Sequence, residues 1–331
     1  MADTIRDRID QYLKDTIAAE RNFEKALATF GNAGEQTPVQ SMLTAASAKA
    51  KTQHERLETL LAKRGATPSE GKTLLAEMLA FTPLSAQIGQ GAAEKNTQHL
   101  MVTFAAAAAE MAMYESLATA GSVGNAEEVV SLARTLQKEE RDDYDQVWAV
   151  LRASAADSFQ TELAKDKTPE DVLKVYLEDA IAAEKSFETQ LMGFSKEATD
   201  SSLSHLFEQH AQETKHQYLQ LTSRLEELGG STSTLKSMLA HVFNFAPKIA
   251  QLGHDEHEKQ TQNLMMAFAV ENAEVAMYES LAEVCRIAGD GQTETLALKI
   301  QKQERATADK IWKQIAPAAR RAMEAHANAV T

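Results

Sequence analysis

Two glutamates stand inside apolar stretches of the sequence, at the same point of a repeated phrase. Glu20 lies in IAAERNFEKAL, residues 17–27, and Glu184 lies in IAAEKSFETQL, residues 181–191. On a helix, residues at i, i+3, i+4 and i+7 share a face, and both glutamates then fall within an apolar face. Because an isolated buried carboxylate is costly, such groups must share protons, pair with cations or bind a metal ion.

Further acids of the second half fall on the apolar faces of two other predicted helices. Glu271 lies at the centre of such a face in the helix expected over 256–288, and Glu274 lies at its edge. Glu304 is bracketed by apolar residues in the helix expected over 293–316. Oxygen-rich clusters suit iron or manganese, usually with some imidazole, and four-helix bundles that hold paired metals project glutamates and histidines inward. We therefore predict a carboxylate-rich iron or manganese site in this half.

The imidazole of this site should come from the helix expected over 202–228. Its ETKH sequence, residues 213–216, has the Glu-x-x-His spacing of metal ligands. The apolar face of this helix passes through His210, with Glu213 on its flank and His216 close to the opposite face. We predict His210 and Glu213 as ligands and a solvent-facing His216. A hydrogen-bonded core histidine is the alternative for His210.

The sequence contains an internal duplication. Adding 164 to a residue number maps the first half onto the second without a gap, so that AMYESLA at 112–118 recurs at 276–282. Through this offset, Glu184, Glu274 and Glu304 correspond to acids that the first half retains: Glu20, Glu110 and Glu140. Halves this similar should share one fold.

The first half has lost the other three candidate ligands. Their positions are occupied by Ala46, Ala107 and Lys49. His54 lies near the apolar face of its own helix and could replace the missing imidazole, while Lys49 or Lys51 could bring an ammonium group near the acids. We therefore predict a fuller site in the second half and a degraded or metal-free site in the first.

The elements that must position these residues are helices. Each half contains four long stretches of helical period, and none has the alternating, β-branched pattern of a strand. Threonine–proline pairs mark three helix starts, at Thr37-Pro38, Thr67-Pro68 and Thr168-Pro169. Gly65 and Gly229 sit where helices should end. We predict an all-α chain of two four-helix bundles, each with a short extra helix in its middle connection, near 74–84 and 235–247.

This pattern also predicts the domain boundaries. The first bundle should span 1–152, with the degraded site. A linker should follow over 153–168, and the second bundle, with the fuller candidate site, should span 169–331.

The composition of the 331-residue chain narrows the classes of partner. Its net charge of -14 disfavours nucleic acid, because a phosphate-binding surface needs the opposite sign. No stretch is long and apolar enough to span a bilayer, and the start of the chain lacks an apolar signal core. The lone Cys285 excludes an intrachain disulfide, which favours a reducing cytoplasm.

Two phrases of the second half resemble a known family. FEQHAQETKHQYLQLTSRLEELGG and FAVENAEVAMYESLAEVCRIAG are similar to the second and third helices of ferritin-like, stress-associated YciF-type proteins. The third-helix pattern of that family, Val-Glu-x-x-Glu followed by Tyr, matches Val270, Glu271, Glu274 and Tyr278, and its first-helix element matches Ala183-Glu184. The resemblance covers nearly the whole chain, once per half.

The resemblance implies a ferritin-like bundle related to rubrerythrins, usually dimeric, with a di-iron or similar metal site. The chain departs from this pattern in two ways. Its fourth helices lack the rubrerythrin histidine, with Thr307 or Asp143 near that place, and the first half lacks the leading third-helix glutamate. The fused pair of halves could form an internal pseudo-dimer in place of the dimer of that family, or assemble as a homo-oligomer.

The sequence is consistent with two functions. The first is a metal-binding, stress-associated protein with at most a di-metal oxidase-like or peroxidase-like activity. The alternative is a non-catalytic structural or interaction protein of the stress response that has lost metal chemistry. Tyr114 and Tyr278 lie near the acids. Core packing is the favoured role for these tyrosines, and a hydrogen bond to an acid is the alternative.

Overall fold

The computed structural model describes residues 4–33, 37–68, 91–231 and 255–329, with side chains described as far as residue 325. Within these residues the chain is helical and contains no strand, which confirms the predicted fold class of two four-helix bundles in tandem. The first bundle consists of α1 (Ile5–Gly31), α2 (Pro38–Lys63), α4 (Ala92–Val123) and α5 (Glu127–Leu163). The second consists of α6 (Pro169–Glu197), α7 (Ser201–Glu227), α9 (Glu256–Ala288) and α10 (Gly291–Ala329). The predicted short extra helices, near 74–84 and 235–247, lie outside the described residues.

Capping residues set several of the helix ends. Thr168 caps α6 in a reciprocal capping box with Asp171, and Thr37 caps α2 in the same way, each followed by proline at the first helical position. Gly65 and Gly229 follow α2 and α7 with φ values of 82° and 73°, a left-handed conformation that glycine adopts without strain.

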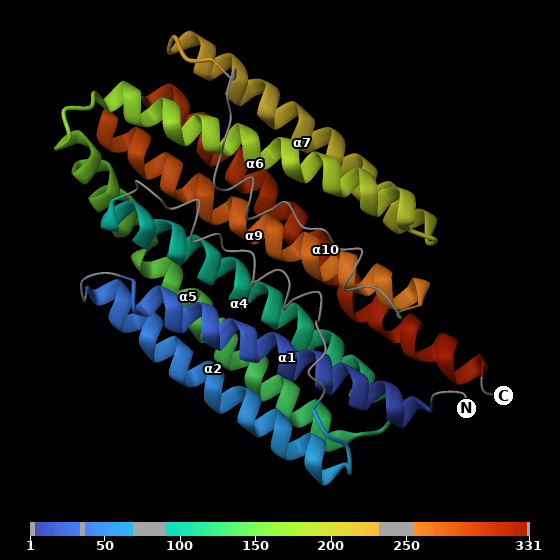
Figure 1. The fold of residues 1–331 in the computed structure, drawn as a ribbon. Coiled ribbons are helices and arrows are strands. Elements are labelled where there is room, and N and C mark those ends of the chain that lie inside the picture. Colours follow the sequence, from blue (N-terminus) through green and yellow to red (C-terminus); the bar gives the residue numbers. More distant parts are fainter. Residues whose placement is uncertain (1–3, 34–36, 69–90, 232–254, 330–331) are drawn as a thin grey trace.

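The helices pair as antiparallel hairpins, and the two bundles meet along their third helices. In the first half α1 packs on α2 and α4 on α5, and in the second half α6 packs on α7 and α9 on α10. α4 and α9 pack against each other, with α1 and α2 on one side of them and α6 and α7 on the other (Figure 1). Both are buried nearly all round, as expected for helices without a continuous polar face.

The predicted linker 153–168 is largely helical. Its residues 153–163 continue α5, so the connection between the bundles is only residues 164–168. Asp166 adopts a left-handed conformation there, and Lys165 and Lys167 each bind a Glu162 carboxylate oxygen at 2.6 Å. None of the helices in the described part of the chain is long and apolar enough to cross a membrane.

Candidate metal centre

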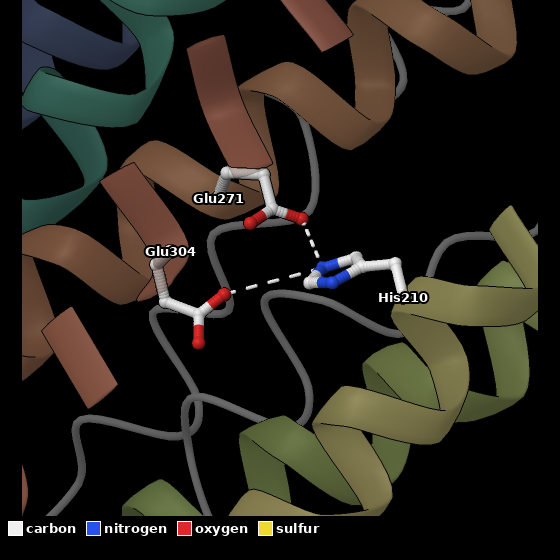
Figure 2. A group of neighbouring side chains, drawn as sticks. All are labelled: His210, Glu271 and Glu304. Carbon is white, nitrogen blue, oxygen red and sulfur yellow. Dashed lines mark ion pairs between the residues drawn. The ribbon is translucent and has the colours of Figure 1, made fainter. Parts of the chain in front are cut away.

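Four helices of the second bundle bring ionisable side chains into its interior. α6 supplies Glu184, α7 supplies His210, α9 supplies Glu271 and Glu274, and α10 supplies Glu304. None of these five side chains is more than 3% exposed. His210 points from α7 toward Glu271 and Glu304 (Figure 2).

Three of these side chains converge closely enough to share one ion. His210 Nε2 lies 2.5 Å from Glu271 Oε1 and 4.0 Å from Glu304 Oε2. One ligand atom from each of the three residues lies within 4.8 Å of the other two. Neither nitrogen of His210 and neither oxygen of Glu271 has a hydrogen-bond partner of good geometry. His210 and Glu271 form an ion pair, but buried polar atoms without a hydrogen bond still call for an explanation, and a cation coordinated between them is one.

The remaining two acids also keep free oxygens. Glu184 Oε1 accepts a hydrogen bond from the Tyr278 hydroxyl, and Glu184 Oε2 has no partner. Both oxygens of Glu274 lack a partner. Glu304 Oε1 accepts from Gln217 Nε2, which leaves Oε2 unpartnered. Every carboxylate of the cluster therefore has at least one oxygen without a partner.

Burial and mutual repulsion hold protons on three of these acids, Glu184, Glu274 and Glu304. Burial raises the pKa of Glu184 to about 8, and it raises the pKa values of Glu274 and Glu304 well above their usual range, with neighbouring carboxylates adding to the shift. For His210, burial opposes the charged form, but Glu271 and Glu213 outweigh it and raise the pKa to about 9. A divalent cation could replace these protons as the source of positive charge.

Glu213 lies at the rim of the cluster. Its side chain is 33% exposed, and its Oε2 lies 3.9 Å from His210 Nδ1. Its Oε1 accepts a hydrogen bond of 3.0 Å from Gln303 Nε2. The interaction with His210 lowers the pKa of Glu213, so this residue offers a permanent negative charge on the outer side of the imidazole. His216 is exposed on the opposite face of α7.

The first bundle also gathers its three retained acids. One oxygen each from Glu20, Glu110 and Glu140 lies within 4.8 Å of the other two, and all three side chains are fully buried. Burial raises the pKa of Glu140 to about 7 and raises the pKa values of Glu20 and Glu110 well above their usual range. The first half therefore has an all-carboxylate cluster.

Among the described residues of the first half, no basic side chain takes the place of His210 in this cluster. His54 pairs instead with Glu24 at 2.8 Å and with Glu58 at 3.1 Å. Lys49 Nζ lies 2.9 Å from Asp143 Oδ2 and donates to the backbone carbonyl of Glu139. Its charge lowers the pKa of the nearby Glu140, which burial raises. Lys51 is exposed.

Sequence reasoning missed the glutamines that donate to the acids, and it ranked core packing above hydrogen bonding for the tyrosines. In the first half the Tyr114 hydroxyl donates to Glu20, and Gln53 Nε2 donates to Glu140 Oε1 at 2.6 Å. Tyr278 and Gln217 make the equivalent bonds in the second half. The available signal was an identical tyrosine and an identical glutamine at equivalent places on the apolar faces of both halves. Both tyrosines thus bind an acid, in addition to packing in the core.

The two bundles also match one protein family in succession. The family described as "Domain of unknown function (DUF892)" matches residues 4–153 and again residues 168–324. These two segments correspond to the two bundles. No curated protein and no solved structure matches the chain.

Proposed function

The chain belongs to the DUF892 family, and we propose that its second half is a ferritin-like metal-binding bundle of the stress-associated YciF type. The metal would be iron or manganese, because the donors are four buried carboxylates and one imidazole. The observation that carries the proposal is the set of buried donor atoms on His210, Glu271 and Glu304, which face one another and, apart from the ion pairs of His210, include atoms without a hydrogen bond.

The residues of this centre would have different roles. Glu271, Glu304 and His210 would bind the first ion, and Glu184 and Glu274 have free oxygens for the same ion or a second one. Glu213 beside His210 Nδ1 would favour the tautomer that leaves Nε2 free to bind, as outer partners of metal-bound histidines do.

Two neutral donors would keep the acids in place. Tyr278 and Gln217 each hold one oxygen of an acid and leave the other for the metal. Bound iron or manganese would supply electron-transfer and Lewis-acid chemistry. The surrounding helices exclude water from the cluster. Any activity would be of the oxidase or peroxidase kind. The protein would act in the cytoplasm, because a single, buried cysteine, Cys285, is typical of a reducing compartment.

Metal analysis of the full chain tests this proposal. Protein purified without chelator should retain iron or manganese, and Glu271→Ala should remove most of it. Glu283→Ala is a matched control, because Glu283 lies in the same helix but pairs with Arg286 outside the cluster. A metal content unchanged by Glu271→Ala would refute the proposed ligand set.

The alternative function is a structural or interaction protein that does not need a metal. The raised pKa values of Glu184, Glu274 and Glu304 favour it, since protonated acids can be buried without a cation. The two functions differ in thermal stability. A ligand that binds only the folded state must stabilise it, so added iron or manganese should raise the melting temperature only if the site binds metal.

A further inference from the structure

A cavity of about 530 Å³ lies between the two bundles, and none of the cluster residues lines it. We propose that this cavity binds a planar, uncharged heteroaromatic ring that has both N–H and C=O groups on its edge, such as a purine, pterin or flavin ring. Its volume is in the range of small-molecule sites, which is roughly 300–1,000 Å³. The proposal is independent of the metal site.

The cavity presents the same three residue types twice. α5 and α10 each contribute an arginine, an aspartate and a tryptophan at equivalent positions of the duplication: Arg141, Asp145 and Trp148, and Arg305, Asp309 and Trp312. The two sets face one cavity because the bundles pack together through α4 and α9, with α5 and α10 beside them (Figure 1). The cavity therefore arises from the pairing of the halves.

The walls of the cavity are suited to a flat ring. Tyr144 and Phe268 add two aromatic side chains to the two tryptophans. Trp312 packs against Phe268, with ring centroids 5.1 Å apart, and the Tyr144 hydroxyl is fixed by donating to Asn272 Oδ1 at 2.8 Å. Phe104 stacks on Tyr144 at 3.8 Å and packs against Trp148 at 5.4 Å, so these two rings form the back of the cavity. Trp312 and Phe268 therefore provide the π-faces on which a heterocycle can stack.

The charged groups of the cavity remain available to a ligand. Arg305 lies over the Trp148 ring at 4.3 Å from its centroid, and Arg141 lies over Tyr144 at 5.2 Å. Neither arginine forms an ion pair with any described carboxylate, although Asp309 and Asp145 each follow one helical turn later. The guanidinium groups thus retain N–H donors, and the aspartates retain acceptor oxygens.

The balance of these charges selects the class of ligand. Two positive and two negative groups cancel, which disfavours a strongly charged molecule. Guanidinium groups only donate hydrogen bonds and carboxylates only accept them. Together they match a ring edge with carbonyl and N–H groups, as arginine and acidic side chains do when they recognise bases.

Tryptophan fluorescence gives a direct test. The chain has two tryptophans, Trp148 and Trp312, and both line the cavity. The full-length protein is titrated with riboflavin and, separately, with guanosine. We expect saturable quenching below about 1 mM by at least one of them, from the usual affinity per ligand atom. A third titration uses 2-naphthoate, an aromatic anion without such an edge, which should bind at least tenfold more weakly.

Paired variants separate ligand recognition from a purely structural role. Arg141→Gln with Arg305→Gln, and Asp145→Asn with Asp309→Asn, should each weaken binding of the ring about tenfold. Arg320→Gln, an exposed arginine of α10 outside the cavity, should leave binding unchanged. If the double arginine variant does not fold, the double aspartate variant still tests whether the charged groups bind the ring. Quenching that never saturates, tighter binding of 2-naphthoate, or an affinity unchanged in the folded aspartate variant would overturn the proposal.

Discussion

At the scale of single residues, the protonation of the acids depends on where they are buried. Burial raises the pKa of Glu184 to about 8 and that of Glu140 to about 7, whereas the rim residue Glu213 has a lowered pKa because His210 lies beside it. The same side chain therefore behaves as a neutral hydrogen-bonding group in the interior and as an anion at the rim. Metal binding would require the interior acids to release protons.

These shifts predict how the stability of the metal-free protein depends on pH. Glu184 and His210 have raised pKa values in the folded state, about 8 and about 9, so the folded protein binds more protons than the unfolded chain above pH 5. The free energy of unfolding should therefore be greatest near pH 5 and fall as pH rises toward 9. Urea unfolding of chelator-treated protein at successive pH values measures this.

Replacing one acid by its amide isolates the contribution of that acid to the fall of stability with pH. Glu184→Gln should flatten the decline, because the amide resembles the protonated acid and does not titrate. The exposed Glu226→Gln is the control and should keep the slope of the unmodified chain. Stability that rises between pH 5 and pH 9 in metal-free protein would contradict the assigned protonation.

The tyrosine donors lead to a second prediction at this scale. Tyr278→Phe removes the hydroxyl that donates to Glu184, and Tyr114→Phe does the same for Glu20 in the first half. Each should lower the free energy of unfolding by about 1–3 kcal/mol, because a buried acceptor loses its partner. Urea unfolding of the metal-free variants tests the two positions separately. Unfolding curves that coincide with that of the unmodified chain would show that neither hydroxyl stabilises its acid.

At the scale of helices, the orientation of side chains could be predicted best for helices that have one buried face and one exposed face. α6 and α7 are amphipathic, so helical phase alone placed Glu184 and His210 inward and His216 outward. The threonine–proline pairs at helix starts and the glycines at helix ends follow from backbone geometry that the local sequence determines.

Helical phase says less about a helix that is buried on every side. α9 contains further buried glutamates, Glu279 and Glu283, and phase alone does not show which neighbour each one meets. Glu279 binds Arg152 of α5, across the boundary between the bundles. Only the packing of the two halves shows that Glu279 meets an arginine of the other bundle, whereas Glu271 and Glu274 face the carboxylate cluster. The duplication aligns positions but does not encode how the two copies pack.

The capping box of α6 permits a prediction at this scale. Thr168→Ala removes the side chain that accepts a hydrogen bond from the Asp171 backbone N–H. It should lower the free energy of unfolding by about 1 kcal/mol. Thr4→Ala is the matched change in α1, which begins with the same kind of box. Urea unfolding measures both, and bound metal should be unaffected because Glu184 lies well inside α6. Loss of metal in folded Thr168→Ala would mean that the helix end helps to position the site.

At the scale of the whole molecule, the two halves form one packed unit. Arg8 of α1 binds Glu258 of α9 at 2.6 Å, and Tyr144 of α5 donates to Asn272 of α9. These contacts, together with the packing of α4 on α9, support the predicted internal pseudo-dimer. Sedimentation at low concentration should then give the mass of one chain, 36.2 kDa. A mass of two chains would favour the predicted alternative, a homo-oligomer.

The duplication also allows one half to be converted into the other. In the first bundle a cavity of about 460 Å³ is lined by Ala46, Ala107 and Lys49, the positions that hold His210, Glu271 and Glu213 in the second bundle. The triple variant Ala46→His, Ala107→Glu and Lys49→Glu should fill this space with ligands and remove the ammonium group near Glu140. If the proposed ligand set is sufficient, metal analysis should find up to twice as much bound metal per chain.

A cavity-filling control separates ligation from packing. Ala46→Leu with Ala107→Leu adds comparable volume without donor atoms, so it should change stability but leave the metal content as it was. Because the retained acids Glu20, Glu110 and Glu140 are already clustered, the only new elements in the triple variant are an imidazole and two carboxylates. A folded triple variant without additional metal would mean that the second bundle contributes something beyond these residues, and the helix packing around its cluster would be the first place to look for it.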